Sequence, residues 1–141
     1  MSQTHFPADL PDTFTDHSRI VPGTDLFVHA IKPHGDIVFS NIDDGREQNR
    51  ISWQDLSLPL VFARVEPSHD GTKLAVLQHY RGDSDYLSVI KRADGSLLVN
   101  FQIAGGTGWV RWADDNSRLV TVRGLFRGTY ISEFSVFDLP F

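Results

Sequence analysis

Histidine is the residue type in this sequence best suited to chemistry, because imidazole binds metals and moves protons near neutral pH. The chain carries six, at His5, His17, His29, His34, His69 and His79. None are spaced as His-x-His or His-x-x-x-His, the arrangements that place two imidazoles on one face of a strand or helix. We therefore expect scattered structural histidines and no metal site.

Two acidic clusters and one glycine-rich stretch have compositions found in ligand-binding loops. Asp43-Asp44-Gly45 and Asp83-Ser84-Asp85 each supply two carboxylates, but neither continues into the twelve-residue calcium loop that ends in glutamate. Gly105-Gly106-Thr107-Gly108 looks like a phosphate cradle, yet a strand-like Trp109-Val110-Arg111-Trp112 follows where a phosphate site needs a helix. We expect solvated loops at the acidic clusters and a connection between two sheets at the glycines.

Covalent and redox chemistry have few candidates in this sequence. It contains no cysteine, which excludes thiolate metal sites, iron–sulfur clusters and cysteine nucleophiles. It also contains no Gly-x-Ser-x-Gly motif of a serine hydrolase. The sequence thus predicts no catalytic residue, no cofactor and no metal, and leaves open a triad that is assembled only in three dimensions.

Composition narrows the class of protein further. Of the 141 residues, 40% are hydrophobic and 22% are charged, which is typical of a globular chain with its own core. A net charge of −5 disfavours a broad nucleic-acid-binding face, since phosphate contacts need clustered cations. The N-terminal stretch lacks the apolar run of a signal peptide, and no apolar run approaches the roughly 20 residues of a membrane span. We expect a soluble, cytoplasmic protein that binds neither nucleic acid nor membrane.

The elements that must position any site are short β-strands. Residues 1–22 contain three prolines and no periodic pattern, so we predict an irregular N-terminal arm followed by a single domain over 23–141. From Leu26 onward, runs rich in Val, Ile, Phe, Leu and Trp alternate with Gly, Asp and Asn punctuation. No window has the period of an amphipathic helix, so we predict little or no helix.

The strands recur as an internal repeat. Residues 65–76 align with residues 110–121, with Asp70 over Asp115 at an offset of 45 residues. Each copy contains an Asp-Gly or Asp-Asn turn, which supplies the positive φ of a tight hairpin, and a third strand follows. A weaker copy aligns residues 31–39 with this hairpin and takes residues 50–56 as its third strand. The predicted copies span about 26–58, 60–104 and 108–141.

These units resemble blades of TolB-like and WD40-like β-propellers. The segments 70–75 and 113–119 are similar to the Ser-Pro-Asp-Gly-x-x-Leu-Ala hairpin of such blades, and Trp53-Gln54-Asp55-Leu56 and Val136-Phe137-Asp138-Leu139 resemble the strand that carries the Trp-Asp pair. No strict Trp-Asp dipeptide or upstream Gly-His occurs. The resemblance implies an all-β fold of about three tandem blade-like antiparallel sheets.

Three blades are fewer than the four to eight of a closed propeller. In propellers an N-terminal strand often completes the final blade, and residues 17–21 are the candidate here. A half-ring that closes by association, a fragment of a longer propeller and a compact open β-structure are the three alternatives. Unpaired strand edges favour self-association or a tightly bound protein partner.

The last copy is rich in the residue types that dominate protein interfaces, Trp, Tyr, Phe and Arg. Alternation places Val110 and Trp112 on one face of a strand and Trp109 and Arg111 on the other, so we predict that Trp112 packs in the core. The alternative for the loop at 123–130 is that its apolar residues simply cover a sheet edge. The predicted partner-binding residues are Trp109, Arg111, Arg123, Phe126, Arg127 and Tyr130.

Taken together, these features predict a non-catalytic protein–protein interaction module that presents blade loops to a partner. A small acidic inhibitor or immunity-type protein is one variant of this hypothesis. The alternative is a fragment or subunit of a propeller-bearing hydrolase, in which the blades form the gating domain of prolyl-oligopeptidase-like enzymes. Carbohydrate or small-ligand binding across the ring axis is a third possibility.

Overall fold

The protein is built from β-strands alone over the residues described by the computed structural model, which are 18–31, 36–52, 63–79, 84–105, 107–126 and 130–141. They form eleven strands in three antiparallel sheets and contain no helix. The predicted all-β fold of about three blade-like sheets is therefore confirmed. No helix that could cross a membrane is found in this part of the chain.

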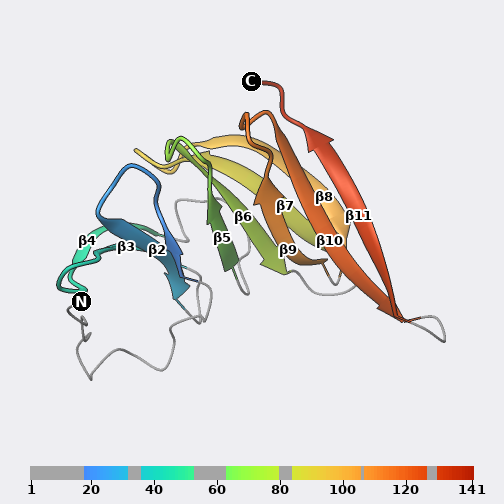
Figure 1. The fold of residues 1–141 in the computed structure, drawn as a ribbon, viewed down its shortest axis with the longest axis horizontal. Helices are drawn as coiled ribbons and strands as arrows, with labels where there is room; N and C mark the ends of the chain where they lie inside the picture. Colours follow the sequence, from blue (N-terminus) through green and yellow to red (C-terminus); the bar gives the residue numbers. More distant parts are fainter. Residues whose placement is uncertain (1–17, 32–35, 53–62, 80–83, 106, 127–129) are drawn as a thin grey trace.

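Each sheet is an antiparallel meander whose strands follow one another in chain order (Figure 1). The first sheet contains β1 (Arg19–Ile20), β2 (Leu26–Ile31), β3 (Asp36–Asn41) and β4 (Glu47–Ile51). The second contains β5 (Ala63–Pro67), β6 (Lys73–His79), β7 (Ser84–Lys91) and β8 (Leu97–Ala104). The third contains β9 (Thr107–Trp112), β10 (Arg118–Phe126) and β11 (Tyr130–Asp138).

The same six-residue hairpin joins the first two strands of every sheet, at 21–26, 68–73 and 113–118. In each, the amide of the first residue donates to the carbonyl of the sixth at 2.9 Å. The amide of the fourth residue donates to the carbonyl of the first at 2.9 to 3.2 Å. The positive φ that each turn needs falls on Gly23, Gly71 and Asn116. The three hairpins therefore share the same closing hydrogen bonds, although the positive φ lies on the third residue in the first hairpin and on the fourth in the other two.

The position of this hairpin in the first sheet differs from the one predicted for the first repeat. Residues 31 and 36 flank the connection between β2 and β3, so the alignment of 31–39 with the hairpin at 68–73 is wrong. The true equivalent, 21–26, uses Pro22-Gly23 in place of Asp-Gly, and a Pro-Gly pair makes a tight turn by a different residue pattern. The strand at 47–51 is the fourth of its sheet rather than the third, and residues 53–56 lie outside the described part.

The segment at 17–21 also has a different role from the expected one. Arg19 pairs with Val28 and Ile20 with Phe27, so β1 is the innermost strand of the first sheet. It does not complete the last sheet, because the strand partner of β9 and of β11 is β10. The last residues of the predicted irregular arm are therefore part of the repeat, and residues 1–17 lie outside the described part.

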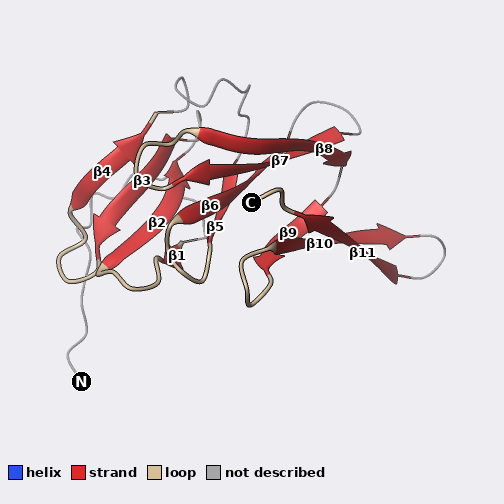
Figure 2. Cartoon of the chain, turned by 90° about the horizontal axis from the view of Figure 1, so that it is seen from above, coloured by secondary structure: helices blue, strands red, loops and turns tan. Residues whose placement is uncertain are grey.

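The three sheets lie one after another in chain order (Figure 2), and the core consists of two layers of side chains, each between consecutive sheets. The first layer joins residues of β2 and β3 to residues of β5, β6 and β7, namely Val28, Ala30, Ile37 and Phe39 with Val65, Leu74, Val76 and Ile90. The second joins the second sheet to the third, with Ala75, Leu77, Leu87 and Val89 against Val110, Trp112, Leu119 and Phe137. The predicted burial of Trp112 is confirmed. The second and third sheets thus each cover one apolar face of the sheet before them.

The hairpins themselves also stack on one another, and Gly71 is the closest point of approach. A Cβ atom at Gly71 would lie 2.4 Å from the carbonyl oxygen of Pro22 in the hairpin of the first sheet. A Cβ at Gly23, which also has a positive φ, would meet nothing within 4 Å. The two glycines therefore share the same backbone requirement and differ in the space around them.

We predict that Gly71→Ala destabilises the fold much more than Gly23→Ala. Both replacements incur about 1 to 2 kcal/mol for a side chain at positive φ, and Gly71→Ala adds overpacking of about 1 to 3 kcal/mol against Pro22. Urea unfolding of the two variants beside the wild type measures the difference. Equal losses would show that the first two hairpins do not pack as described.

His29 lies buried on the outer side of the first sheet, where its ring stacks on Phe27 with centroids 5.3 Å apart. Burial lowers the pKa of His29 from 6.5 to about 4, while the Glu47 carboxylate opposes the shift and the Arg50 guanidinium adds to it. The folded chain therefore holds this imidazole neutral at mildly acidic pH, where an exposed histidine would be charged.

The free energy of unfolding should consequently fall as the pH drops from 6.5 towards 4. In that window the unfolded chain binds a proton at His29 that the folded chain does not bind, so stability rises with pH. The expected contribution is at most about 3 kcal/mol. Urea unfolding at several pH values should give a flatter curve for His29→Gln than for the wild type. Parallel curves would contradict the assignment.

Candidate interaction site

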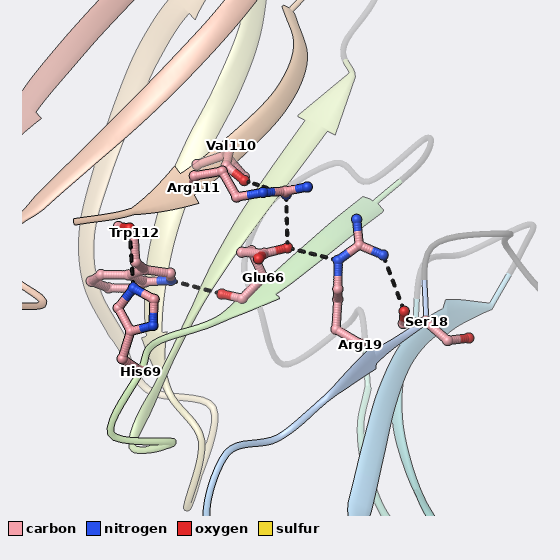
Figure 3. A network of polar contacts seen from close by, with 7 residues as sticks. All are labelled: Ser18, Arg19, Glu66, His69, Val110, Arg111 and Trp112. Carbon is pink, nitrogen blue, oxygen red and sulfur yellow. Dashed lines mark hydrogen bonds and ion pairs between the residues drawn. The ribbon is translucent and has the colours of Figure 1, made fainter. Parts of the chain in front are cut away.

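Charged residues at matched positions of the three inner strands form one polar network (Figure 3). Arg19 of β1, Glu66 of β5 and Arg111 of β9 are equivalent residues, because each precedes the first residue of its hairpin by two positions. The Nε atom of Arg19 lies 3.0 Å from Oε2 of Glu66, and Nη1 of Arg111 lies 3.3 Å from the same oxygen. One carboxylate therefore links all three sheets.

The same region joins the second and third sheets through three further hydrogen bonds. The indole Nε1 of Trp112 donates to the backbone carbonyl of Glu66 at 2.8 Å. The His69 ring nitrogen lies 3.2 Å from the carbonyl oxygen of Trp112, and the His69 amide donates to the Asn116 side chain at 2.8 Å. A buried indole with a satisfied N–H explains why Trp112 fits a core position.

A further arginine completes the inner-strand cluster. Burial lowers the pKa of Arg64, and the positive charges of Arg19 and Arg111 lower it further, while Glu66 opposes the shift. Guanidinium groups stay protonated at physiological pH, so this network supplies fixed charge and hydrogen bonds rather than proton transfer. Within the described residues, no group of three or more His, Asp or Glu is arranged to hold a metal ion.

The strand register brings several predicted partner-binding positions onto one face of the third sheet. Trp109 pairs with Val122, Arg111 with Val120, and Phe126 with Tyr130. These pairs alternate along the strands with the residues that pack on the second sheet. Their strand positions therefore belong to the opposite face of the third sheet. For Trp109, Phe126 and Tyr130 only this strand position is described.

The other two predicted residues are placed differently. Arg123 alternates with Val122 and so belongs to the opposite face of β10, where its guanidinium lies 3.9 Å from the Glu133 carboxylate on β11. Arg127 lies outside the described residues. The structure therefore groups four of the six predicted positions on one face and separates Arg123 from them.

That face, which we call the open face, is defined by the side chains of Val120, Val122, Phe134 and Val136. Val120 pairs with Val136 and Val122 with Phe134. Phe134 and Val136 are 66% and 59% exposed, although both are large and apolar. Exposed apolar residues that gather on one face are typical of interaction surfaces.

Sequence reasoning missed Phe134 and Val136 as site residues. The predicted third strands of the second and third copies are β7 and β11, and the structure aligns Phe134 with Leu87 and Val136 with Val89. Both Leu87 and Val89 are fully buried. The sequence carries the alternation that places Phe134 and Val136 together on one face of this strand, but not the exposure of that face.

Comparisons with known proteins support the fold. No protein-family model matches the sequence, and a search of curated proteins finds no match. The structure is similar to Pyrococcus horikoshii acylaminoacyl peptidase, with a TM-score of 0.62 and 18% identity over 90% of this chain and 23% of that one. It is also similar to an uncharacterized protein from Listeria monocytogenes EGD-e, with a TM-score of 0.62 and 14% identity over 99% of this chain and 43% of that one. The chain spans less than half the length of either protein.

We predict that Glu66→Gln destabilises the fold by about 1 to 2 kcal/mol, between the values for exposed and buried ion pairs. Its side chain is only 15% exposed and it binds two arginines. Glu133→Gln is the matched control, because the Glu133 side chain is 48% exposed and 3.9 Å from its partner, and its loss should be below about 0.5 kcal/mol. Equal losses in urea unfolding would remove Glu66 as a link between the sheets.

Proposed function

We propose that this chain is a non-catalytic interaction module with propeller-like sheets, and that a protein partner docks on the open face of the third sheet. The observation that carries the proposal is the exposure of Phe134 and Val136 at positions where Leu87 and Val89 of the second sheet are fully buried. Covering such side chains is worth about 1.5 to 3 kcal/mol each. The face therefore has a strong tendency to bind another apolar surface.

A projecting ribbon extends the same face. The pairing of β9 with β10 ends at Arg123, while β10 and β11 continue through three more residue pairs, up to Phe126 and Tyr130. Figure 1 shows the β10–β11 hairpin extending beyond β9. A two-stranded ribbon has little independent stability, so a partner that packs on it would stabilise both strands. This supports the proposed role of residues 123–130 in partner binding.

A second candidate function is a segment of a propeller-bearing hydrolase, and the likeness to acylaminoacyl peptidase favours it. In that case the partner is a hydrolase domain and the sheets gate its active site. An acidic inhibitor or immunity-type protein is the corresponding variant of the first candidate. In both cases we propose a cytoplasmic protein that works through protein contacts and uses no nucleic acid, membrane or cofactor.

Phe134→Asp with Val136→Asp should abolish partner capture and leave the fold intact. Both side chains are exposed, so their replacement changes the free energy of unfolding by less than about 0.5 kcal/mol. Affinity capture with wild-type and variant bait, followed by mass spectrometry, measures the loss. Leu97→Asp is the matched control, since Leu97 is exposed and apolar but belongs to β8 of the second sheet.

The identity of the captured protein separates the two candidates. A hydrolase polypeptide that depends on Phe134 and Val136 supports the second candidate, and any other dependent protein supports the first. If every captured protein binds the double variant as well as the wild type, docking on the open face is ruled out.

A further inference from the structure

We infer that the partner surface seated on the open face is itself a blade-type antiparallel sheet, supplied by polypeptide other than residues 1–141. This inference rests on the proposed function and names the kind of surface that the partner presents. It follows from the repeat, because the chain already shows twice how such a face is covered.

Three faces with the same register form one series. The paired residues are Val28 with Phe39 and Ala30 with Ile37 in the first sheet, Ala75 with Val89 and Leu77 with Leu87 in the second, and Val120 with Val136 and Val122 with Phe134 in the third. The first face is covered by the second sheet and the second face by the third sheet. The open face is therefore the third member of a series whose first two members are both covered by an antiparallel sheet.

The covering surfaces are also alike, and they define the chemistry of the partner. The second sheet contributes Val65, Leu74 and Ile90, and the third sheet contributes Val110, Leu119 and Phe137 at the equivalent strand positions. Each set has one aliphatic residue on the inner strand, leucine on the second strand and a large apolar residue on the third. A sheet with this pattern is the expected partner surface.

A second copy of this chain fits less well. The equivalent positions of its first sheet hold Ser18, Phe27 and Ser40, and Ile20 lies on the same face. Ser40 stands where the covering sheets have Ile90 or Phe137, and it is buried together with His29 on that same face. Among the described residues of that face, Ile20, 66% exposed, is the one large apolar side chain that is exposed. A head-to-tail dimer would therefore bring too little apolar surface to the open face.

Backbone hydrogen bonds show how a fourth sheet can be joined in register. The amide of Leu139 donates to the carbonyl of Ser117 at 2.9 Å, as the amide of Arg92 donates to Thr72 at 3.0 Å in the second sheet. Phe141 therefore stands at the position of Asp94. Appending a copy of residues 95–141 after Phe141 first adds an outer strand, equivalent to β8, to the third sheet. It then adds a fourth sheet whose strands are equivalent to β9, β10 and β11.

The experiment compares this extended chain with the wild type in urea unfolding. We expect a single cooperative transition with a higher midpoint, because the appended sheet covers Phe134 and Val136. Phe134→Asp should then lower the folding equilibrium constant by more than about tenfold in the extended chain while hardly changing it in the wild type. The matched control is the same extension in which the appended copies of Val110 and Leu119 are both replaced by aspartate. It keeps the added length and removes the apolar contact with the open face.

Two outcomes would overturn the inference. One is an unchanged midpoint with equal effects of Phe134→Asp in the extended chain, the control extension and the wild type. The other is self-association of the wild type, measured by light scattering, that both Phe134→Asp and Ile20→Asp abolish, since the occupant would then be a second copy. If either outcome is found and partner capture still depends on Phe134, only the blade-type surface is refuted. The proposed function then stands.

Discussion

Face-to-face packing of consecutive sheets is the interaction on which the rest of this structure depends. A β-sheet with apolar side chains on both sides must be covered on both sides, and each of the two core layers meets that need for one pair of sheets. The stacked hairpins keep the sheets in the same relative position, with Gly71 held against Pro22. Because the packing is repeated from sheet to sheet, the open face of the third sheet is apolar like the two faces that are covered.

The inner-strand network adds specificity to this packing. Glu66 accepts from arginines of both neighbouring sheets, and Trp112 bonds to the Glu66 backbone while its ring enters the second core layer. Polar and apolar contacts of the second and third sheets therefore meet at adjacent residues. This arrangement favours one registration of the sheets, whereas apolar contact alone would tolerate small displacements.

Much of the fold was accessible from the sequence, because turn chemistry and alternation are local signals. Asp70-Gly71 and Asp115-Asn116 identified the second and third repeats, and alternation along β9 identified Trp112 as buried. The first repeat was misaligned because its hairpin is closed by a different turn, with the positive φ on Gly23, the third hairpin residue, rather than on the fourth as at Gly71 and Asn116. The Glu66 network and the exposure of Phe134 could not be predicted, since both depend on which sheets stack, a property that no local pattern reports.

Hydrogen–deuterium exchange of the isolated chain tests most directly whether the third sheet is left open. β7 and β11 are equivalent strands, but the apolar face of β7 is covered and that of β11 is exposed. We predict that amides of β7 exchange only on global unfolding, whereas even the β11 amides that are hydrogen-bonded to β10 exchange faster through local opening. Equal protection of the two strands would show that the face of β11 is already covered, and would contradict the account.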